Sequence, residues 1–154
     1  HPKVFDINEP LEKSLFLLEL DAKKKHIRVV NKIEKKIKIY ADLNMINTVI
    51  RNIINNAIKF TPQKGEICIS AKQTNPEIVI IQISDTGIGI DKDDMDKLFD
   101  FNYSHSKTGT DSEKGNGLGL ILCKKNKKKN GGKIWVESQK GKGSTFSFEL
   151  KTAR

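Results

Sequence analysis

Hydrophobic residues recur at helical spacing near the start of the chain. Leu11, Leu15 and Leu18 would share one face of a helix formed by residues 9–25. Asn8 stands where a side chain can accept a hydrogen bond from the first turn, so we expect it to cap this helix. The pattern predicts an amphipathic helix with one buried face.

A longer helical pattern occupies residues 42–60. Its apolar positions recur every three or four residues, and Pro62 cannot continue a helix. The apolar positions are Ile46, Val49, Ile50, Ile53 and Ala57. The pattern predicts a second helix with an apolar face.

Strand patterns flank this second helix. Residues 27–31 and 36–41 are strand-like and a short charged segment separates them, which predicts a hairpin at the edge of a sheet. Residues 65–72 and 77–85 predict two further strands joined by a turn at Asn75-Pro76. Residues 77–85 are too continuously apolar to form an edge strand, so we expect them in the interior of the sheet.

The second half of the chain begins with a polar segment and ends with two more strands. Residues 102–116 have no periodicity and are longer than an ordinary connection, which predicts a mobile lid. A helix over about 117–129 is expected next, ending at the flexible step Asn130-Gly131-Gly132. Residues 132–138 and 144–150 have strand patterns.

Length and composition indicate one compact domain. The chain has 154 residues, of which 36% are hydrophobic, and this suits a single core over residues 1–154. No apolar run approaches the roughly 20 residues that a membrane-spanning helix needs. Cys68 and Cys123 lack the spacing of a zinc site, so we expect a soluble domain in a reduced, cytoplasmic setting.

The net charge of +9 leaves several partner classes open. The excess of 28 Lys and Arg over 19 Asp and Glu could attract nucleic acid, an anionic membrane or a phosphorylated ligand. The basic runs at 23–25, 32–38 and 124–129 contain no interleaved aromatic residues, and we expect them to form solvated surface. We expect no nucleic-acid partner, although a nucleic-acid-binding module is the alternative that charge alone permits.

Three polar residues of the second helix form a stripe that could line a cleft. Asn52, Asn56 and Lys59 are separated by four and three residues, so they lie on one side of a helix. Mg²⁺ prefers few protein oxygen ligands and takes the rest from water and phosphate. The pattern predicts Asn56 as a metal ligand and Lys59 as a phosphate contact.

Two glycine-rich segments suggest a nucleotide. Asp85 ends an apolar strand, where its carboxylate can accept from an exocyclic amine, and the glycines of DTGIGI (85–90) allow backbone close to a flat ring. GNGLGL (115–120) opens a helix whose free N–H groups could bind phosphate. Neither segment fits a Rossmann fingerprint or a P-loop.

Five short segments, in order along the chain, resemble the sequence boxes of histidine kinases. NIINNAIKFT, DTGIGI, LFDF, GNGLGL and GKGSTF are similar to the asparagine box, the first glycine box, the phenylalanine box, the second glycine box and the terminal glycine box. The resemblance covers about residues 4–150. It implies the two-layer α/β sandwich of GHKL ATPases and kinases (the Bergerat fold), a mixed sheet with helices on one face.

The resemblance also implies a role for each site residue. It implies that Asp85 pairs with the adenine amino group, that Asn56 holds Mg²⁺ and that Asn52 supports the metal or its waters. Lys59 would contact the phosphates. The other residues implied at the nucleotide are Phe60, Gly87, Gly89, Ile90, Gly115, Gly117, Leu118, Gly119 and Thr145, the last reaching adenine through water. Phe99 would anchor the lid, and Lys107 would contact the γ-phosphate.

The activity implied by the resemblance is phosphoryl transfer from Mg-ATP to a histidine. The acceptor would lie on a separate dimerisation domain, which is absent here, because none of the three histidines has the family's acceptor context. The implied downstream partner is a response regulator receiver domain, and the implied parent is a dimeric, membrane-associated kinase. Asn52 occupies the position where the related ATPases carry a glutamate base, so hydrolysis should be slow. The alternatives are a GHKL-fold serine kinase or ATPase, or a non-catalytic nucleotide-binding module.

Overall fold

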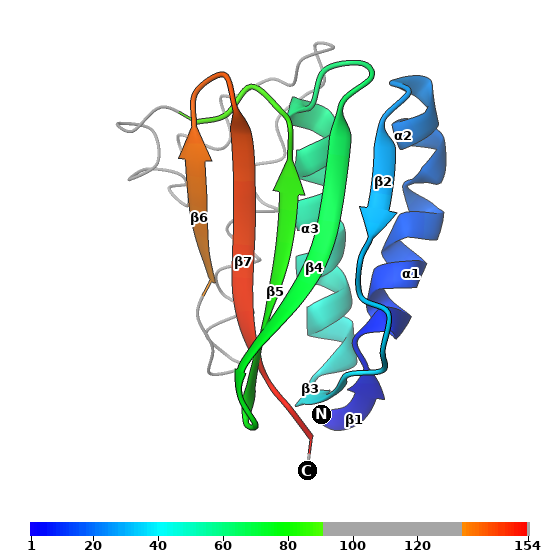
Figure 1. The fold of residues 1–154 in the computed structure, drawn as a ribbon. Coiled ribbons are helices and arrows are strands. Elements are labelled where there is room, and N and C mark those ends of the chain that lie inside the picture. The colour runs from blue at the N-terminus through cyan, green and yellow to red at the C-terminus, as the bar shows by residue number, and fades with distance from the viewer. Residues whose placement is uncertain (91–133, 154) are drawn as a thin grey trace.

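The protein is a two-layer α/β sandwich, as the sequence predicted. The computed structural model describes residues 1–90 and 134–153, in which three helices cover one face of a five-stranded mixed sheet (Figure 1). The strands lie in the order β2 (Arg28–Asn31), β4 (Glu66–Asn75), β5 (Ile78–Asp85), β7 (Gly143–Lys151) and β6 (Ile134–Gln139). The β2–β4 pair is parallel, and the other three pairs are antiparallel.

The predicted first helix is interrupted. It forms α1 (Asn8–Leu17) and α2 (Glu19–Lys24), and Leu18 between them leaves the helical backbone conformation at φ −102° and ψ 6°. Leu11 of α1 and Ala22 of α2 are both buried in one core, so the break interrupts the helix without interrupting its apolar face.

The predicted cap of this helix is wrong. The helix begins at Asn8 itself, and Ile7 occupies the cap position without a side-chain hydrogen bond. The carboxylate of Asp6 instead accepts from the Asn8 backbone N–H, with Oδ1 and N 3.0 Å apart. Because the helix starts one residue earlier than expected, the useful acceptor lies two residues before Asn8.

The predicted hairpin of residues 27–31 and 36–41 is also wrong. β2 pairs with β4, while β3 (Lys38–Ala41) pairs with β1 (Lys3–Asp6), a strand that the sequence pattern did not reveal. Phe5 faces Ile39 across this second, two-stranded sheet, and both side chains are buried. Strand pairing follows the burial of these side chains rather than the shortness of the connecting loop.

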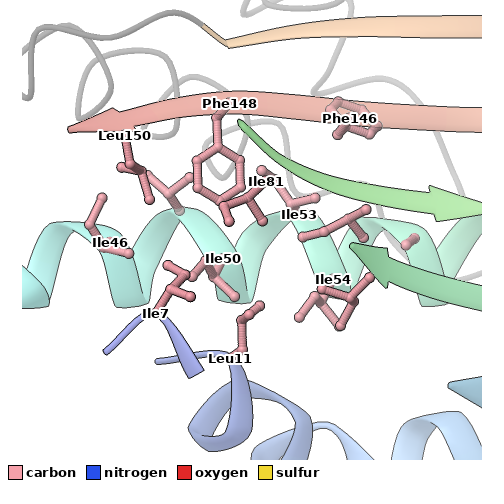
Figure 2. Packing of buried hydrophobic residues seen from close by; sticks show 14 of the residues in the cluster. Ile7, Leu11, Ile46, Ile50, Ile53, Ile54, Ile81, Phe146, Phe148 and Leu150 are labelled. Carbon is pink, nitrogen blue, oxygen red and sulfur yellow. The ribbon is translucent and has the colours of Figure 1, made fainter. Parts of the chain in front are cut away.

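Helix α3 (Leu43–Phe60) carries the main apolar face, as predicted. Asp42 caps it, because its Oδ1 accepts from the Met45 N–H at 3.1 Å. The side chains packed between α3 and the sheet include Ile46, Ile50 and Ile53 of the helix and Ile81, Phe148 and Leu150 of the strands (Figure 2). All five apolar positions expected to be buried on α3 are at most 2% exposed.

The interior position predicted for residues 77–85 is confirmed. β5 lies between β4 and β7, and its alternate residues Val79, Ile81 and Ile83 are fully buried against the helical layer. The expected turn before β5 is present, since Asn75 Oδ1 accepts from the N–H groups of Glu77 and Ile78. The last two predicted strands correspond to β6 and β7.

Two expectations concern parts of the chain outside the described residues. They are the lid over 102–116 and the helix over about 117–129.

In residues 1–90 and 134–153, no helix is both long enough and apolar enough to cross a membrane.

A pair of phenylalanine variants tests how the two layers are held together. Phe148→Ala removes a fully buried ring between the layers, and we expect it to lower the free energy of unfolding by about 3–5 kcal/mol. Phe16→Ala makes the same chemical change at a side chain that is 76% exposed, and we expect an effect within about 0.5 kcal/mol. Urea denaturation measures both, and equal losses would contradict the packing described above.

Candidate nucleotide-binding site

The C-terminal half of α3 contributes three polar side chains to the candidate site. Asn52, Asn56 and Lys59 are buried, at 9%, 6% and 5% exposure, although all three residue types are usually solvated. No described residue forms a hydrogen bond with the side-chain amide of Asn56, so its oxygen is available to a ligand. Lys59 Nζ lies 5.0 Å from the centre of the Phe60 ring, within the range of a cation–π contact.

Asp85 provides a carboxylate at the end of the central strand. Its Oδ1 accepts from the backbone N–H of Gly87 at 2.8 Å and from that of Ser144 at 3.3 Å. Among the described residues, no donor reaches Oδ2, which leaves that oxygen for a donor on a ligand. One oxygen therefore orients the carboxylate while the other is available for binding.

Burial changes the acidity of this carboxylate. Desolvation raises the pKa of Asp85 from its ordinary 3.8 to about 6, and the two backbone N–H bonds oppose this shift without cancelling it. The folded chain therefore holds the proton more tightly than the unfolded chain does. The stability that the protonated form contributes is fully present below about pH 3.8 and is lost as the pH rises through 6.

Gly87 allows the turn after β5 to lie against the end of α3. A Cβ at this position would stand 2.6 Å from the carbonyl oxygen of Phe60 and 2.7 Å from Asp85 Oδ1, closer than nonbonded atoms approach. The next residue, Ile88, donates its N–H to the Phe60 carbonyl at 3.1 Å. A side chain at Gly87 would therefore separate Asp85 from the helix that carries Asn56 and Lys59.

Gly89 fits the same turn against the loop between β6 and β7. Its φ of 74° lies in the left-handed region, and a Cβ there would overlap the backbone of Gln139. The Gly141 N–H donates to the Ile88 carbonyl at 2.7 Å. Backbone contacts thus hold the turn on both sides.

Two serines that the sequence pattern did not reveal extend the polar side of the site. Ser138 Oγ accepts from the N–H of Ile90 at 2.8 Å and lies 2.7 Å from Ser144 Oγ. Ser144 faces Asp85 in the β5–β7 register, so its side chain lies on the same face of the sheet. Only the strand register reveals this pairing, since the two residues are far apart in sequence.

Thr145 lies on the opposite face of the sheet from Asp85. It pairs with Ser84, and their hydroxyl oxygens are 2.9 Å apart. Successive residues of a strand point to opposite faces, so the water-mediated adenine contact expected of Thr145 does not fit its position here. Ser144 is the residue of this strand that adjoins the Asp85 carboxylate.

Six of the predicted site residues lie outside the described part of the chain. They are Phe99, Lys107, Gly115, Gly117, Leu118 and Gly119.

Within the described part, an apolar groove of about 440 Å³ lies away from the candidate site, between α1, α2, β2 and α3. Its lining includes Leu15, Leu18 and Ile54 but none of the predicted site residues.

The site combines three kinds of chemistry where α3 meets the turn after β5. A carboxylate can accept from an amine, a neutral amide oxygen can bind a hard cation, and an ammonium group can contact an anion. No cluster of three His, Cys, Asp or Glu residues capable of holding a metal occurs in residues 1–90 and 134–153. A cation bound through Asn56 would therefore depend on oxygens of the ligand and water, which suits Mg²⁺ on a polyphosphate.

Comparisons with known proteins agree with this chemistry. The family described as histidine kinase-, DNA gyrase B- and HSP90-like ATPase matches residues 41–154. The sensor histidine kinase WalK of Bacillus subtilis is 35% identical over 130 residues, which are 83% of this chain and 21% of WalK. The chain thus spans about a fifth of that relative's length.

Solved structures extend the likeness to the whole fold. The catalytic domain of histidine kinase ThkA superposes with a TM-score of 0.83 and 26% identity, covering 100% of this chain and 99% of that domain. ThkA in complex with the response regulator protein TrrA gives a TM-score of 0.79 at 25% identity, covering 99% of this chain and 42% of the matched one. The fold, the site chemistry and these likenesses together assign the chain to the histidine kinase-, DNA gyrase B- and HSP90-like ATPase family, as a histidine kinase catalytic domain.

Proposed function

We propose that this domain binds Mg-ATP where α3 meets the turn after β5 and transfers the γ-phosphoryl group to a histidine on a separate dimerisation domain. One observation carries the proposal. The half-buried carboxylate of Asp85 has its Oδ1 occupied by backbone donors, and the turn that follows it contacts the end of the helix that bears Asn56 and Lys59. The proposal therefore assigns base recognition to the end of β5 and phosphate binding to the adjoining end of α3.

Asp85 would recognise the adenine amino group. The carboxylate needs an outside donor, because burial without one disfavours its charged form. An exocyclic amine supplies that donor to Oδ2. A guanine base has a carbonyl oxygen at the same position, and this acceptor cannot form a hydrogen bond with the carboxylate oxygen. This arrangement favours adenine over guanine.

Asn56 and Lys59 would act on the phosphate side. The Asn56 amide oxygen would hold Mg²⁺, which neutralises charge on the β- and γ-phosphates during transfer. Lys59 would contact a phosphate oxygen with its ammonium group. Its ring contact with Phe60 restricts where that group can lie.

In the transfer, a bond forms from an imidazole nitrogen of the acceptor to the γ-phosphorus, and the bond from that phosphorus to the bridging oxygen breaks. ADP leaves with the bridging oxygen, and the imidazole N–H proton passes to solvent. The buried Asn52 offers no carboxylate to activate water, so hydrolysis should compete poorly with transfer.

The longer protein would supply the partners. In one similar structure ThkA is in complex with the response regulator protein TrrA, and we propose that a receiver domain likewise takes the phosphoryl group here. We further propose a dimeric parent kinase, associated with a membrane, that keeps this domain on the cytoplasmic side. The alternative functions are those of the related ATPases and of the serine kinases with this fold. The transfer experiment described below distinguishes them from the proposed one.

The raised pKa of Asp85 predicts a pH-dependent affinity for ATP. Binding requires the carboxylate, so affinity should be constant above about pH 7 and fall by up to about tenfold per pH unit below 6. Isothermal titration with ATP and with purine riboside triphosphate separates this effect from titration of the phosphates, because the second ligand lacks the amine. Parallel pH curves for the two ligands would contradict the assignment of Asp85 to the amine.

Removing the amide of Asn56 should affect the metal-dependent step. We expect Asn56→Ala to lower the apparent affinity for Mg²⁺ in the transfer reaction by about ten- to hundredfold while retaining part of the nucleotide binding. Asn44→Ala, at an exposed position on the first turn of α3, is the matched control and should behave as the unaltered protein. Unchanged rates for Asn56→Ala at limiting Mg²⁺ would place the metal on other groups.

The acceptor chemistry can be tested with labelled γ-phosphate. The isolated domain should bind ATP without labelling itself, and adding the dimerisation helices of its parent kinase should produce a label on histidine. That label should be lost in acid, because phosphohistidine is acid-labile and phosphoserine is not. Strong, acid-stable labelling of the isolated domain would overturn histidine transfer and favour a serine kinase.

A further inference from the structure

Lys25 is a buried cation in a run that the sequence pattern assigned to solvated surface. Its neighbours Lys23 and Lys24 are exposed, as expected, but Lys25 is only 4% exposed. It directly follows α2, at the end of the molecule where α3 and β5 also terminate (Figure 1). A buried lysine requires polar partners, so its contacts indicate its role.

The ammonium group of Lys25 satisfies the end of α3. Its Nζ donates to the carbonyl oxygen of Ile58 at 2.8 Å and to that of Lys59 at 3.1 Å. Carbonyls in the last turn of a helix lack the usual partner four residues on, although the Ile58 carbonyl also accepts from the Thr61 N–H at 3.4 Å. The C-terminal end of the helix dipole favours a cation. Lys25 therefore caps α3 although it comes from a different helix.

The next carbonyl along α3 belongs to the nucleotide site. The Phe60 carbonyl accepts from the Ile88 N–H in the turn that follows Asp85. Three successive carbonyls at the end of α3 are thus held from two sides, the first two by Lys25 and the third by the turn after β5. Lys59, whose carbonyl Lys25 holds, is itself a proposed phosphate contact.

Lys25 is fixed at its backbone as well as at its side chain. Its carbonyl accepts from the Lys64 N–H at 2.9 Å, in the loop between α3 and β4, and its own N–H donates to the Ala22 carbonyl at 3.2 Å. The ammonium group is therefore held in place relative to the residues on both sides of the α3 terminus. A fixed donor can orient the helix end, whereas a mobile surface lysine could not.

We propose that Lys25 is a positioning residue for nucleotide binding. It holds the last turn of α3 in place, which keeps the side chains of Asn56 and Lys59 in position relative to Asp85. It does not touch the nucleotide. The proposal rests on the proposed function, since it assigns the α3 end and the turn after β5 to one ATP site. Without the ammonium group, two buried carbonyls would lose a donor and the last turn would loosen.

The decisive variant is Lys25→Met, which keeps the length of the side chain and removes its charge and donors. We expect the ATP affinity of the folded variant to fall by about tenfold, because the loosened last turn of α3 would no longer hold Asn56 and Lys59 in place. The Ile88 amide proton resonance should move upfield as its bond to Phe60 lengthens. The amide of Thr152, bonded to the Glu77 carbonyl at the far end of β5, should not move.

Matched variants separate positioning from general stability. Lys24→Met changes an exposed neighbour and should alter neither the affinity nor the Ile88 resonance. A folded Lys25→Met with unaltered ATP affinity and an unmoved Ile88 resonance would overturn the proposal, even if its melting temperature fell. If Lys25→Met does not fold, Lys25→Gln decides by the same two measurements: its shorter, uncharged amide cannot hold both carbonyls, so an unaltered ATP affinity and an unmoved Ile88 resonance would again overturn the proposal. Failure of the unaltered protein to bind ATP would instead refute the proposed function.

Discussion

The nucleotide site depends on a close backbone contact between the end of α3 and the turn after β5. The Ile88 N–H reaches the Phe60 carbonyl, and Gly87 is the residue without a side chain that permits this approach. The contact joins two elements with different tasks, because the strand ends in a carboxylate and the helix carries an amide and an ammonium group. Any side chain at Gly87 would force these groups apart.

The packing of the two layers sets the chemistry of Asp85. The same face of β5 that buries Val79, Ile81 and Ile83 against α3 continues to Asp85 at the strand end. The carboxylate is therefore partly desolvated, and its pKa rises to about 6. Among the described residues, backbone donors reach one oxygen of this carboxylate only, so a donor such as an adenine amine could bind the other. Here the packing of the hydrophobic core also sets the acidity of a side chain in the candidate site.

Excess positive charge serves different purposes along the chain. Most lysines of the described residues are solvated, as the absence of interleaved aromatic residues predicted, but Lys25 and Lys59 are buried beside the end of α3. One contacts carbonyls of the helix and the other contacts the Phe60 ring. Both lie at the negative end of the α3 dipole, where a cation is favourable. Net charge alone could not distinguish these two from the rest.

The sequence by itself determined α3, the interior strand β5, the fold class and the motif residues Asp85, Gly87 and Asn56, because periodicity and glycine spacing are local properties. Only the tertiary structure decided that β3 pairs with β1, that Ser144 rather than Thr145 adjoins Asp85, and that Lys25 caps α3. These features join residues that are distant in sequence. Strand register and burial select such partners, and both depend on how the whole chain packs.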